Sequence, residues 1–520
     1  MGMLQGSLLS AVTFVPLLGA FLLILIPRQS LRQIRLFAFA VTLLDFLLSL
    51  KLYFGFDPTR PGFQFCESRT WIPQLNTSYD LGIDGISLFL VLLTTFLMVL
   101  SVLASFSAIT ERVREYFFMM LLLETGMIGV FVSLDLLLFY LFWEGMLIPM
   151  YFLIGIWGGP RRIYASIKFF IYTLVGSVLM LVGIIYLYQL YAAQEGHGTF
   201  SILRLYALDI SSTEQIWLFW AFFLAFAIKV PLFPFHTWLP DAHVEAPTAG
   251  SVLLAGILLK MGTYGMLRFN LPLFPHATHE YAGFIMIMAL VGIIYGSLMA
   301  MIQKDIKKLV AYSSVAHLGF VVLGIFALNQ EAVEGAIYQM LNHGVSTGAL
   351  FIIVGVIYER AHTREIAALG GLWKVMPVYS AFFLIVALSS IGLPGTNGFV
   401  GEFLILMGTF KSRAVFAVIA STGVILSAVY MLWALQRMLY GVAPEKHSKH
   451  PDLNPRETLT LVPLIICIFL MGIYSPMFTR CMHASTRQLL YGATVSRPVQ
   501  VEQRGIETGP HTTAAVGDRE

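Results

Sequence analysis

The sequence predicts an all-α protein that crosses a membrane many times. Hydrophobic residues make up 58% of the 520 residues and charged residues only 12%, whereas about 25% of the residues of a soluble domain are charged. The apolar residues form runs of about 20, the length at which a helix spans a bilayer. Two of these runs are interrupted by proline, near Pro231 and near Pro394. Because proline removes a backbone N–H and clashes with the preceding turn, both runs are expected to form broken helices.

We expect about fourteen transmembrane helices, which include two inverted five-helix repeats. The expected spans cover residues 4–26, 34–56, 84–109, 115–133, 135–157, 164–191, 215–238, 246–269, 279–302, 308–328, 334–358, 376–410, 413–440 and 458–478. Spans seven and twelve are the broken ones, and each is the fourth member of a five-span block (spans 4–8 and spans 9–13). Two consecutive blocks with an odd number of spans enter the membrane from opposite sides, as in the inverted repeats of transporters.

This pattern divides the chain into five parts. They are three N-terminal spans (1–110), the first five-helix repeat (111–270), the second repeat (271–440), span fourteen (441–480) and a polar external tail (481–520). Orientation follows from lysine and arginine, which gather in cytoplasmic loops. With the loop of Arg28, Arg32 and Arg35 in the cytoplasm, the cytoplasmic loops hold most of the 32 lysines and arginines. Both termini are therefore expected on the external side.

Composition and motifs exclude several kinds of site. The net charge is +3, and there is no basic patch of the kind that binds nucleic acid. The three cysteines, Cys66, Cys467 and Cys481, are isolated, so neither an iron–sulfur cluster nor a zinc site is expected. The sequence has no GxGxxG, GxxxxGKS/T or HExxH motif. We expect this chain to bind no metal and no cofactor.

Two lysines stand inside apolar runs. Lys229 directly precedes Val230 and Pro231, with Pro234 three residues further on. Lys260 interrupts the next run roughly 18 Å into its helix, near the bilayer midplane. Because a buried charge in a membrane is costly, an ionisable residue at this depth is a functional candidate.

A carboxylate in span five is the natural partner of Lys229. Glu144 lies near midplane and must be neutral or paired there. A Glu144–Lys229 pair can change its charge when a proton arrives, which favours a role in proton transfer. The alternative is a static ion pair that joins the two spans.

Lys260 and Glu402 are two further candidates. The sequence places no carboxylate beside Lys260, which favours reversible protonation over a role as a fixed charge. Glu402 follows the second break, at Pro394-Gly395, and is a candidate for proton transfer. The alternative for Glu402 is that it only caps the N-terminus of the half-helix.

Several histidines accompany these charges. His317 and His343 each lie about eight residues into a span, where histidine can pass protons near neutral pH or simply donate a core hydrogen bond. His236 and His243 flank the first break. They are expected either to take part in proton uptake or to belong to a solvated loop.

Two carboxylates lie nearer the N-terminus. Glu124 in span four is a second candidate on the uptake side. Asp45 in span two lies outside both repeats and is expected to contact a neighbouring helix or headgroup water.

Six motifs resemble the antiporter-like subunits in the membrane arm of respiratory complex I, and among these the subunit M family. They are Trp71-Ile-Pro-x-Leu with Tyr79-Asp-Leu-Gly-Ile-Asp-Gly-Ile-Ser87, Trp143-Glu144-Gly-Met-Leu-Ile-Pro, the run from Lys229 to His243, Leu-Leu-Lys260-Met-Gly, Tyr312-Ser-Ser-Val-Ala-His317 and Leu393-Pro-Gly-Thr-x-Gly-Phe-x-Gly-Glu402. The resemblance covers nearly all of the chain up to about residue 480. Related subunits of the arm have lysine where this chain has Glu402, and the largest has a long lateral helix, so subunit M is favoured.

The resemblance implies a proton path and a function. Glu144 and Lys229 would be the coupled pair, Lys260 the central lysine and Glu402 the terminal residue, with the two histidines of the second repeat between the last two. The path would couple proton pumping to electron transfer from NADH to quinone. NADH, FMN, iron–sulfur clusters and quinone would be bound by partner subunits. The implied partners are the other antiporter-like subunits and the lipid of a bacterial inner membrane.

Two other functions share parts of this pattern. A subunit of a multisubunit Na⁺/H⁺ antiporter would have the same core and the same Lys–Glu pair. A structural membrane scaffold would use its buried charges only for assembly, which the row of charges near midplane disfavours. Flavin and iron–sulfur absorbance in the purified complex would separate the pump from the antiporter.

Overall fold

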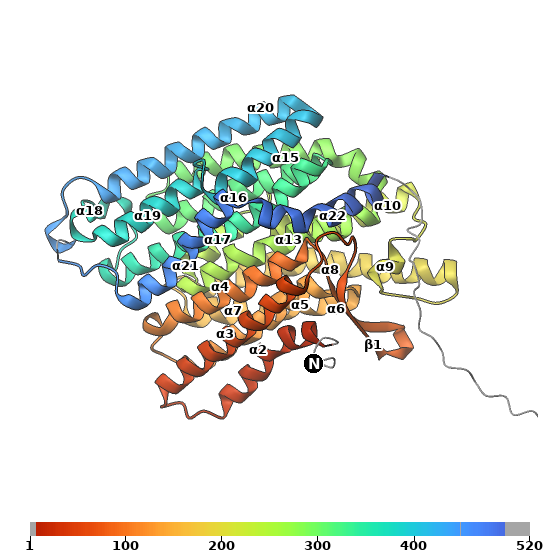
Figure 1. The fold of residues 1–520 in the computed structure, drawn as a ribbon, viewed down its shortest axis with the longest axis horizontal. Helices are drawn as coiled ribbons and strands as arrows, with labels where there is room; N and C mark the ends of the chain where they lie inside the picture. The colour runs from red at the N-terminus through yellow and green to blue at the C-terminus, as the bar shows by residue number, and fades with distance from the viewer. Residues whose placement is uncertain (1–6, 448, 495–520) are drawn as a thin grey trace, which may run out of the picture.

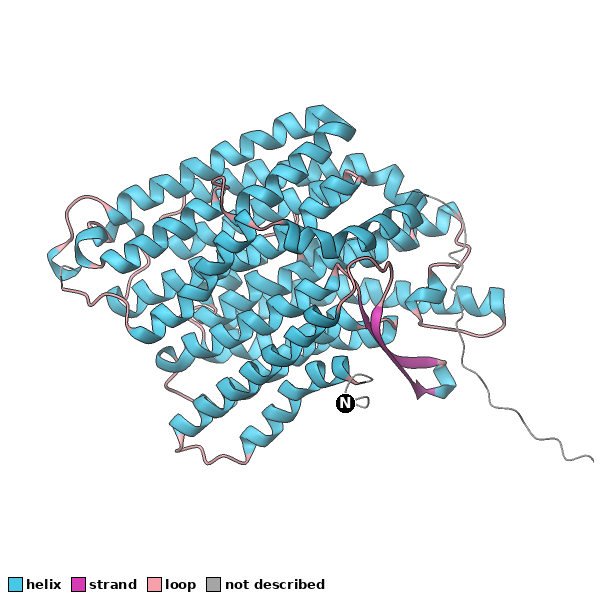
Figure 2. Ribbon diagram, in the orientation of Figure 1, coloured by secondary structure: helices cyan, strands magenta, loops and turns pink. Residues whose placement is uncertain are grey.

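The computed structural model describes residues 7–447 and 449–494. Most of this part is helical, and its helices lie side by side in one elongated bundle (Figure 1). A single two-stranded hairpin, magenta in Figure 2, projects from the bundle. The expected all-α fold is therefore correct for the bundle and wrong for residues 64–83.

The hairpin follows the first two helices, α2 (Leu8–Ile24) and α3 (Leu31–Gly55). Its strands, β1 (Gln64–Ile72) and β2 (Thr77–Ile83), are antiparallel and are joined by a 3₁₀ turn, η1 (Pro73–Leu75). The strands are short and lie between two apolar runs, so hydropathy alone does not separate them from a loop.

The helices of the first half surround a fully buried, irregular helix. In chain order they are α4 (Ser87–Ala108), α5 (Val113–Val132), α6 (Leu136–Gly145), α7 (Leu147–Trp157), α8 (Arg162–Glu195), α9 (Ile202–Leu205), α10 (Ser212–Lys229), α11 (Trp238–Glu245), α12 (Thr248–Leu253), the π-helical turn η2 (Leu254–Leu258), α13 (Leu259–Gly265), a second π turn η3 (Met266–Asn270) and α14 (Leu271–Leu273). The segment from α12 to α14 is buried along its most apolar stretch.

The second half is wrapped around another buried helix, α17. In chain order its helices are α15 (Pro275–Met301), α16 (Ile306–Phe326), α17 (Gln330–Ala361), η4 (Ile366–Ala368), α18 (Leu372–Val375), α19 (Pro377–Ser390), α20 (Asn397–Leu439), η5 (Glu445–His447), α21 (Pro455–Ile473) and α22 (Pro476–Thr494). α17 is buried along its most apolar stretch, whereas only a third of the corresponding stretches of α20 and α21 is buried. α17 and the α12–α14 segment therefore form the centre of the bundle.

Eleven helices in the described part are long and apolar enough to cross a membrane, and α2 and α19 are shorter apolar helices. The expected span five is divided into α6 and α7, because Pro149 cannot donate to the carbonyl of Gly145. The expected spans twelve and thirteen meet within α20, where the non-helical backbone of Arg413 (φ −148°, ψ 80°) divides α20 into two helices joined at a kink.

The expected polar tail, 481–520, is wrong for its first part. Residues 481–494 belong to α22, and residues 495–520 lie outside the described part. α22 lies against the bundle, where Gly85 N donates to Ser485 Oγ at 2.9 Å and Gln330 Nε2 donates to Thr486 Oγ1 at 2.6 Å. Its mixture of polar and apolar residues lowers its mean hydropathy, so a search for long apolar runs does not find it.

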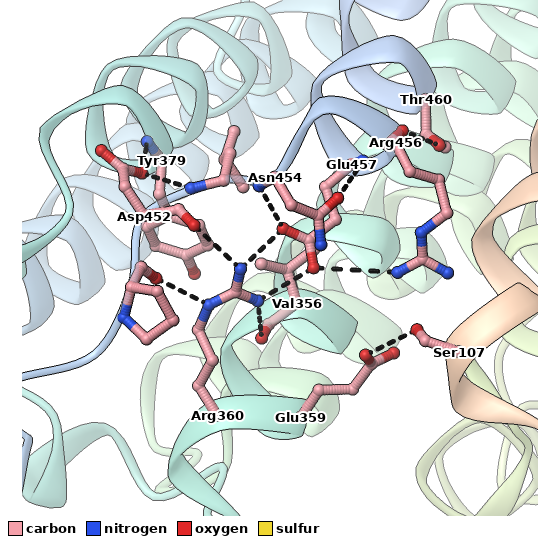
Figure 3. Close-up of polar contacts among 12 residues, drawn as sticks. Ser107, Val356, Glu359, Arg360, Tyr379, Asp452, Asn454, Arg456, Glu457 and Thr460 are labelled. Atoms are coloured by element: carbon pink, nitrogen blue, oxygen red, sulfur yellow. Dashed lines mark hydrogen bonds and ion pairs between the residues drawn. The ribbon is translucent and has the colours of Figure 1, made fainter.

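One polar cluster fastens three helices at one end of the bundle (Figure 3). Arg360, near the end of α17, forms an ion pair with Glu457 in the first turn of α21 at 2.6 Å. Arg360 also donates to the carbonyls of Pro451 and Asp452. The carboxylate of Asp452 accepts the backbone N–H of Tyr379, at the start of α19, at 3.0 Å. The cluster holds α17, α19 and α21 in a fixed arrangement around the interior.

Candidate functional site

A row of ionisable side chains runs through the centre of the bundle, from the break after α10 to the break before α20. Its members come from five different helices and none is more than 4% exposed; they are Lys229, Lys260, His343, His317 and Glu402. Since burying ionisable groups in an apolar interior is costly, the contacts of each member decide what the row can do.

The first break places Lys229 at the end of a helix. α10 stops at Lys229, and the chain turns through residues 230–237 before α11 begins. Pro231 and Pro234 lie in this turn, as the sequence predicts. The indole N–H of Trp238 donates to the carbonyl of Ile228 at 2.9 Å, which satisfies one acceptor at the open helix end.

The expected ion pair between Glu144 and Lys229 is not closed in this structure. The two charges act on each other. However, neither Lys229 Nζ nor Glu144 Oε1 has a hydrogen-bond partner among the described residues, and no contact within 4.0 Å joins them. Lys229 Nζ lies instead 5.2 Å from the ring centroid of Trp143 and 5.7 Å from that of Phe169. A static ion pair in direct contact is therefore the wrong description.

The separation follows from helix geometry. Trp143 and Glu144 are consecutive residues of α6 and cannot face the same neighbour. Trp143 points into the bundle, where its indole N–H donates to Ser177 Oγ at 3.0 Å. Glu144 is half-buried and Gly145 beside it is exposed. The carboxylate thus lies between the interior and the outer face of the bundle.

A π-helical turn positions the side chain of Lys260. η2 widens the helix immediately before α13, so that the carbonyl of Ala255 accepts a hydrogen bond from Lys260 Nζ. Lys260 Nζ also lies 2.6 Å from His343 Nδ1 on α17. Among the described residues, no carboxylate contacts Lys260 Nζ.

Two histidines and a glutamate continue the row from Lys260. The rings of His343 and His317 have their centroids 5.9 Å apart. His317 Nδ1 lies 2.8 Å from Glu402 Oε1. Gln339 Nε2 donates to the same carboxylate oxygen at 2.9 Å. Glu402 is therefore the end of a connected series, and the alternative that it only caps α20 is wrong, since its partners are side chains of α16 and α17.

A small cavity lies beside the two histidines. It measures about 10 Å³ and is at the lower limit of the space that holds one water molecule. Its lining includes His317, His343, Asn342, Ser346 and Ser389. The Nε2 atoms of both histidines are buried and have no hydrogen-bond partner among the described residues. Each histidine therefore contacts its neighbour in the row through Nδ1, and its Nε2 atom has no partner among the described residues.

The second break places Glu402 beside His317. α19 ends at Ser390, and Gly392 and Gly395 adopt φ values of +78° and +92°, which favour glycine. Pro394 lies between these two glycines. Ser389 Oγ donates to Asn397 Oδ1 at 2.5 Å across the break, which ties the two half-helices together.

The histidines of the first break are buried. His236 stacks on Phe233, with centroids 5.7 Å apart, and His243 stacks on Phe351 at 4.7 Å. Both histidines are at most 4% exposed, so the alternative of a solvated loop is wrong.

Glu124 on α5 and Asp45 on α3 are not members of the row. Both are fully buried in the middle of their helices, and their carboxyl groups act on each other. The expectation that Asp45 contacts a neighbouring helix is correct, and contact with headgroup water is wrong.

The sequence analysis did not single out Gln339 and Asn342. Asn342 Nδ2 donates to Gln339 Oε1 at 3.0 Å, and Gln339 in turn donates to Glu402. With His343 and Ser346 they form a polar stripe at helical spacing within an otherwise apolar α17. This spacing was the signal in the sequence that could have identified them.

No group of three or more His, Cys, Asp or Glu side chains in residues 7–447 and 449–494 is arranged to hold a metal ion. Two family models match the chain. The model described as NADH:quinone oxidoreductase/Mrp antiporter, TM, matches residues 133–427. The model described as NADH-ubiquinone oxidoreductase chain 4, amino terminus, matches residues 14–129.

Individual proteins agree with these models. NADH-quinone oxidoreductase subunit M of Rhodobacter capsulatus is 49% identical over 502 residues, which cover 93% of this chain and 96% of that protein. A chain of respiratory complex I from Thermus thermophilus with bound NADH has a TM-score of 0.85 and 32% identity, covering 93% of this chain and 99% of that chain. A chain of the Mrp complex from Dietzia sp. DQ12-45-1b has a TM-score of 0.83 but 19% identity, so it shows a shared fold. With more than half of its length matched by one family model and such a relative along nearly its full length, the chain belongs to the subunit M family of NADH-quinone oxidoreductases.

Proposed function

We propose that this chain is a proton-translocating, antiporter-like subunit in the membrane arm of an NADH:quinone oxidoreductase. The observation that carries the proposal is the series of contacts from Lys260 through His343 and His317 to Glu402. Each member can gain and lose a proton, and the series is buried in the centre of a membrane bundle. Membership of the subunit M family supports the same function.

Proton transfer along the series follows from the free nitrogen atoms. Lys260 gives a proton to Nδ1 of His343, and His343 releases one from Nε2. A water molecule in the cavity between the rings connects this atom to Nε2 of His317. His317 then delivers a proton from Nδ1 to Glu402 Oε1, 2.8 Å away. Each histidine passes the proton by taking it on one nitrogen and releasing it from the other.

Glu144 and Lys229 control the other end of the path. Because they act on each other without a direct contact, protonation of Glu144 changes the electrostatic environment of Lys229 without breaking a bond. Lys260 lies beyond the first break on α13, which packs against α10, so a change at Lys229 reaches Lys260 through the contact of these two helices. We assign Glu124, His236 and His243 no step in this path, and His236 and His243 remain candidates for proton uptake.

The architecture we propose has fourteen spans, with α5 to α14 and α15 to α20 as two inverted five-span repeats. Supporting this, each repeat has its broken helix at the corresponding position, between α10 and α11 and between α19 and α20. The proposed division is 1–110, 111–270, 271–440, 441–480 and a C-terminal part from 481. The distribution of lysine and arginine supports external termini in a bacterial inner membrane.

The partners we propose are the other antiporter-like subunits on either side of this chain, and the surrounding lipid. NADH, FMN, iron–sulfur clusters and quinone belong to other subunits of the complex. A second candidate function is a subunit of a multisubunit Na⁺/H⁺ antiporter, which the fold shared with the Mrp complex favours. Flavin and iron–sulfur absorbance that co-purifies with the chain supports the first function, and a complex without them supports the second.

The test of the proposed function is NADH-driven proton pumping by membranes that contain the assembled complex. We expect Glu402→Gln to remove most of the pumping, because glutamine keeps the hydrogen bonds but cannot take up a proton. Glu280→Gln, which makes the same change at an exposed position of α15, is the matched control and should pump normally. Normal pumping by Glu402→Gln would contradict the proposal.

A further inference from the structure

A pair of buried carboxyl groups lies outside the row. Asp45 is on α3 and Glu124 is on α5, two helices that pack against each other. Both side chains have no exposed surface. We propose that Asp45 and Glu124 form a second proton-binding site, in which the two carboxyl groups hold at least one proton between α3 and α5 at neutral pH. This site goes beyond the proposed path, which does not include either residue.

The two carboxyl groups depend on each other. They are close enough to act on each other, but all four of their oxygen atoms are without a hydrogen-bond partner in the described part of the chain. Buried carboxylates normally accept hydrogen bonds from backbone N–H groups, side chains or cations. A protonated carboxyl group supplies the donor that this site otherwise lacks.

The surrounding helices do not supply a compensating cation. α2 and α4, which pack against α3 and α5, contain no ionisable side chain. The ionisable groups on α3 and α5 themselves and on the other elements packed against them are Arg32, Arg35, Lys51, Tyr53, Tyr79, Asp80, Arg114, Glu115, Tyr116, Tyr140, Glu144, Tyr151, Lys260 and Tyr264. None of these groups has an electrostatic effect on Asp45 or Glu124 like the effect that these two carboxyl groups have on each other.

Each positively charged side chain among these groups is either bonded to other residues or exposed at the surface. Lys260 Nζ is bonded to Ala255 and His343. Arg35 donates to the carbonyl of Ile109 at 2.9 Å. Lys51 is exposed. Two ionised carboxylates facing each other in an apolar interior would combine the cost of desolvation with like-charge repulsion, and a bound proton removes both.

A third polar group lies at the same depth. Ser49 Oγ and Thr95 Oγ1, 2.8 Å apart, fix the register of α3 against α4, and Ser105 Oγ and Tyr116 Oη, 3.0 Å apart, fix that of α4 against α5. Counting along these antiparallel helices places Ser101 of α4 within about one turn of both carboxyl groups.

Ser101 Oγ is itself fully buried and has no hydrogen-bond partner among the described residues. Two carboxyl groups and one hydroxyl provide too few oxygen atoms for a cation such as Ca²⁺, which takes 6–8 of them. A proton is the ligand that this set of groups fits.

The proposal is tested by infrared difference spectroscopy of the intact complex in membranes at neutral pH. We expect the double variant Asp45→Asn/Glu124→Gln to lose a C=O stretching band of a protonated carboxylic acid that the wild-type complex shows. The control Glu280→Gln, at an exposed site, should lose only bands of an ionised carboxylate. Retention of every acid band in the double variant would overturn the proposal.

Two further results are decisive. If the double variant does not assemble on a native gel, the single variant Glu124→Gln gives the same comparison, and an unchanged acid region in its spectrum overturns the proposal. The spectrum of the wild-type complex is also recorded with and without sodium. An acid band that appears only after sodium is removed would identify a cation site and would likewise overturn it.

Discussion

At Lys229 the positive charge is stabilised by aromatic rings and not by a carboxylate in contact. Nζ lies 5.2 Å from the Trp143 centroid, within the range of a cation–π interaction. In this arrangement the charges of Lys229 and Glu144 influence each other, although the two side chains do not form a closed ion pair. A pair of this kind responds to the arrival of one proton more readily than a hydrogen-bonded salt bridge does, because no contact has to be broken.

Lys229→Ala and Glu144→Ala are each expected to lower NADH-driven proton pumping strongly, on the order of a hundredfold, as for the loss of an acid–base group. Lys51→Ala, at an exposed lysine of α3, is the matched control and should pump like the wild type. Pumping is compared in membranes in which native gels show equal amounts of assembled complex. Wild-type pumping in either variant would remove the pair from the path.

The individual charges were the part of the site that the sequence predicted well, because lysine, histidine and glutamate within apolar runs have few structural reasons to be there. The sequence placed Lys260, His317, His343 and Glu402 in the interior, and the structure adds that they form one series. It could not predict that Glu144 and Lys229 are apart, since this depends on which side of α6 faces α10. The facing of Asp45 and Glu124 was missed for the same reason.

At the scale of elements, irregular helices position the row. The break between α10 and α11 ends a helix at Lys229, the π turn η2 directs Lys260 toward His343, and the break between α19 and α20 brings Glu402 to His317. The two proline breaks were predictable from the sequence. The π turns were not, because the residues from 254 to 258 carry no local signal that separates a π turn from a regular helix.

Gly392 offers a test of the second break. Its φ of +78° is unfavourable for any residue with a Cβ, and a Cβ there would lie 3.5 Å from Glu402 Oε2. Gly392→Ala is expected to cost about 1–2 kcal/mol, seen as a lower Tm of the purified complex, and to reduce pumping. Gly292→Ala, in a regular part of α15 where the nearest atoms would be 4.0 Å away, should change neither. Equal behaviour of the two variants would mean that the backbone at the second break is not constrained.

At the scale of the whole molecule, α17 is the element that connects the parts. It carries His343 and Gln339 in its middle, and Arg360 fastens its end to α21 and to the segment before α21. Because α17 is buried along its most apolar stretch, a displacement of this helix would alter the contacts to both Lys260 and Glu402.

Arg360→Ala leaves Glu457 buried without its main partner and is expected to destabilise the chain by about 3–5 kcal/mol. Arg456, whose contact with the same carboxylate is longer at 3.8 Å, is the control, and Arg456→Ala should cost no more than about 1 kcal/mol. Thermal unfolding of the purified complex measures both. A similar small loss in both variants would show that the cluster does not hold α17 in place.

Bundle architecture was largely predictable from hydropathy, because each apolar run has to be buried in lipid or protein. The hairpin and α22 were not, since their sequences are polar enough to read as loops, and their structure depends on packing against the bundle. Thr486 and Ser485, for example, bond to residues more than 150 positions away, and no local pattern reports such a contact.

The central claim is that protons move along the row through Lys260, and the comparison of Lys260→Arg with Lys260→Ala tests it most directly. Arginine keeps the positive charge but stays protonated at any working pH. The measurement is the number of protons pumped per NADH oxidised, in membranes where a native gel confirms assembly. If Lys260 passes protons, the arginine variant should lose pumping as fully as the alanine variant does. Near-normal pumping by Lys260→Arg together with loss in Lys260→Ala would contradict this account and leave Lys260 as a fixed charge.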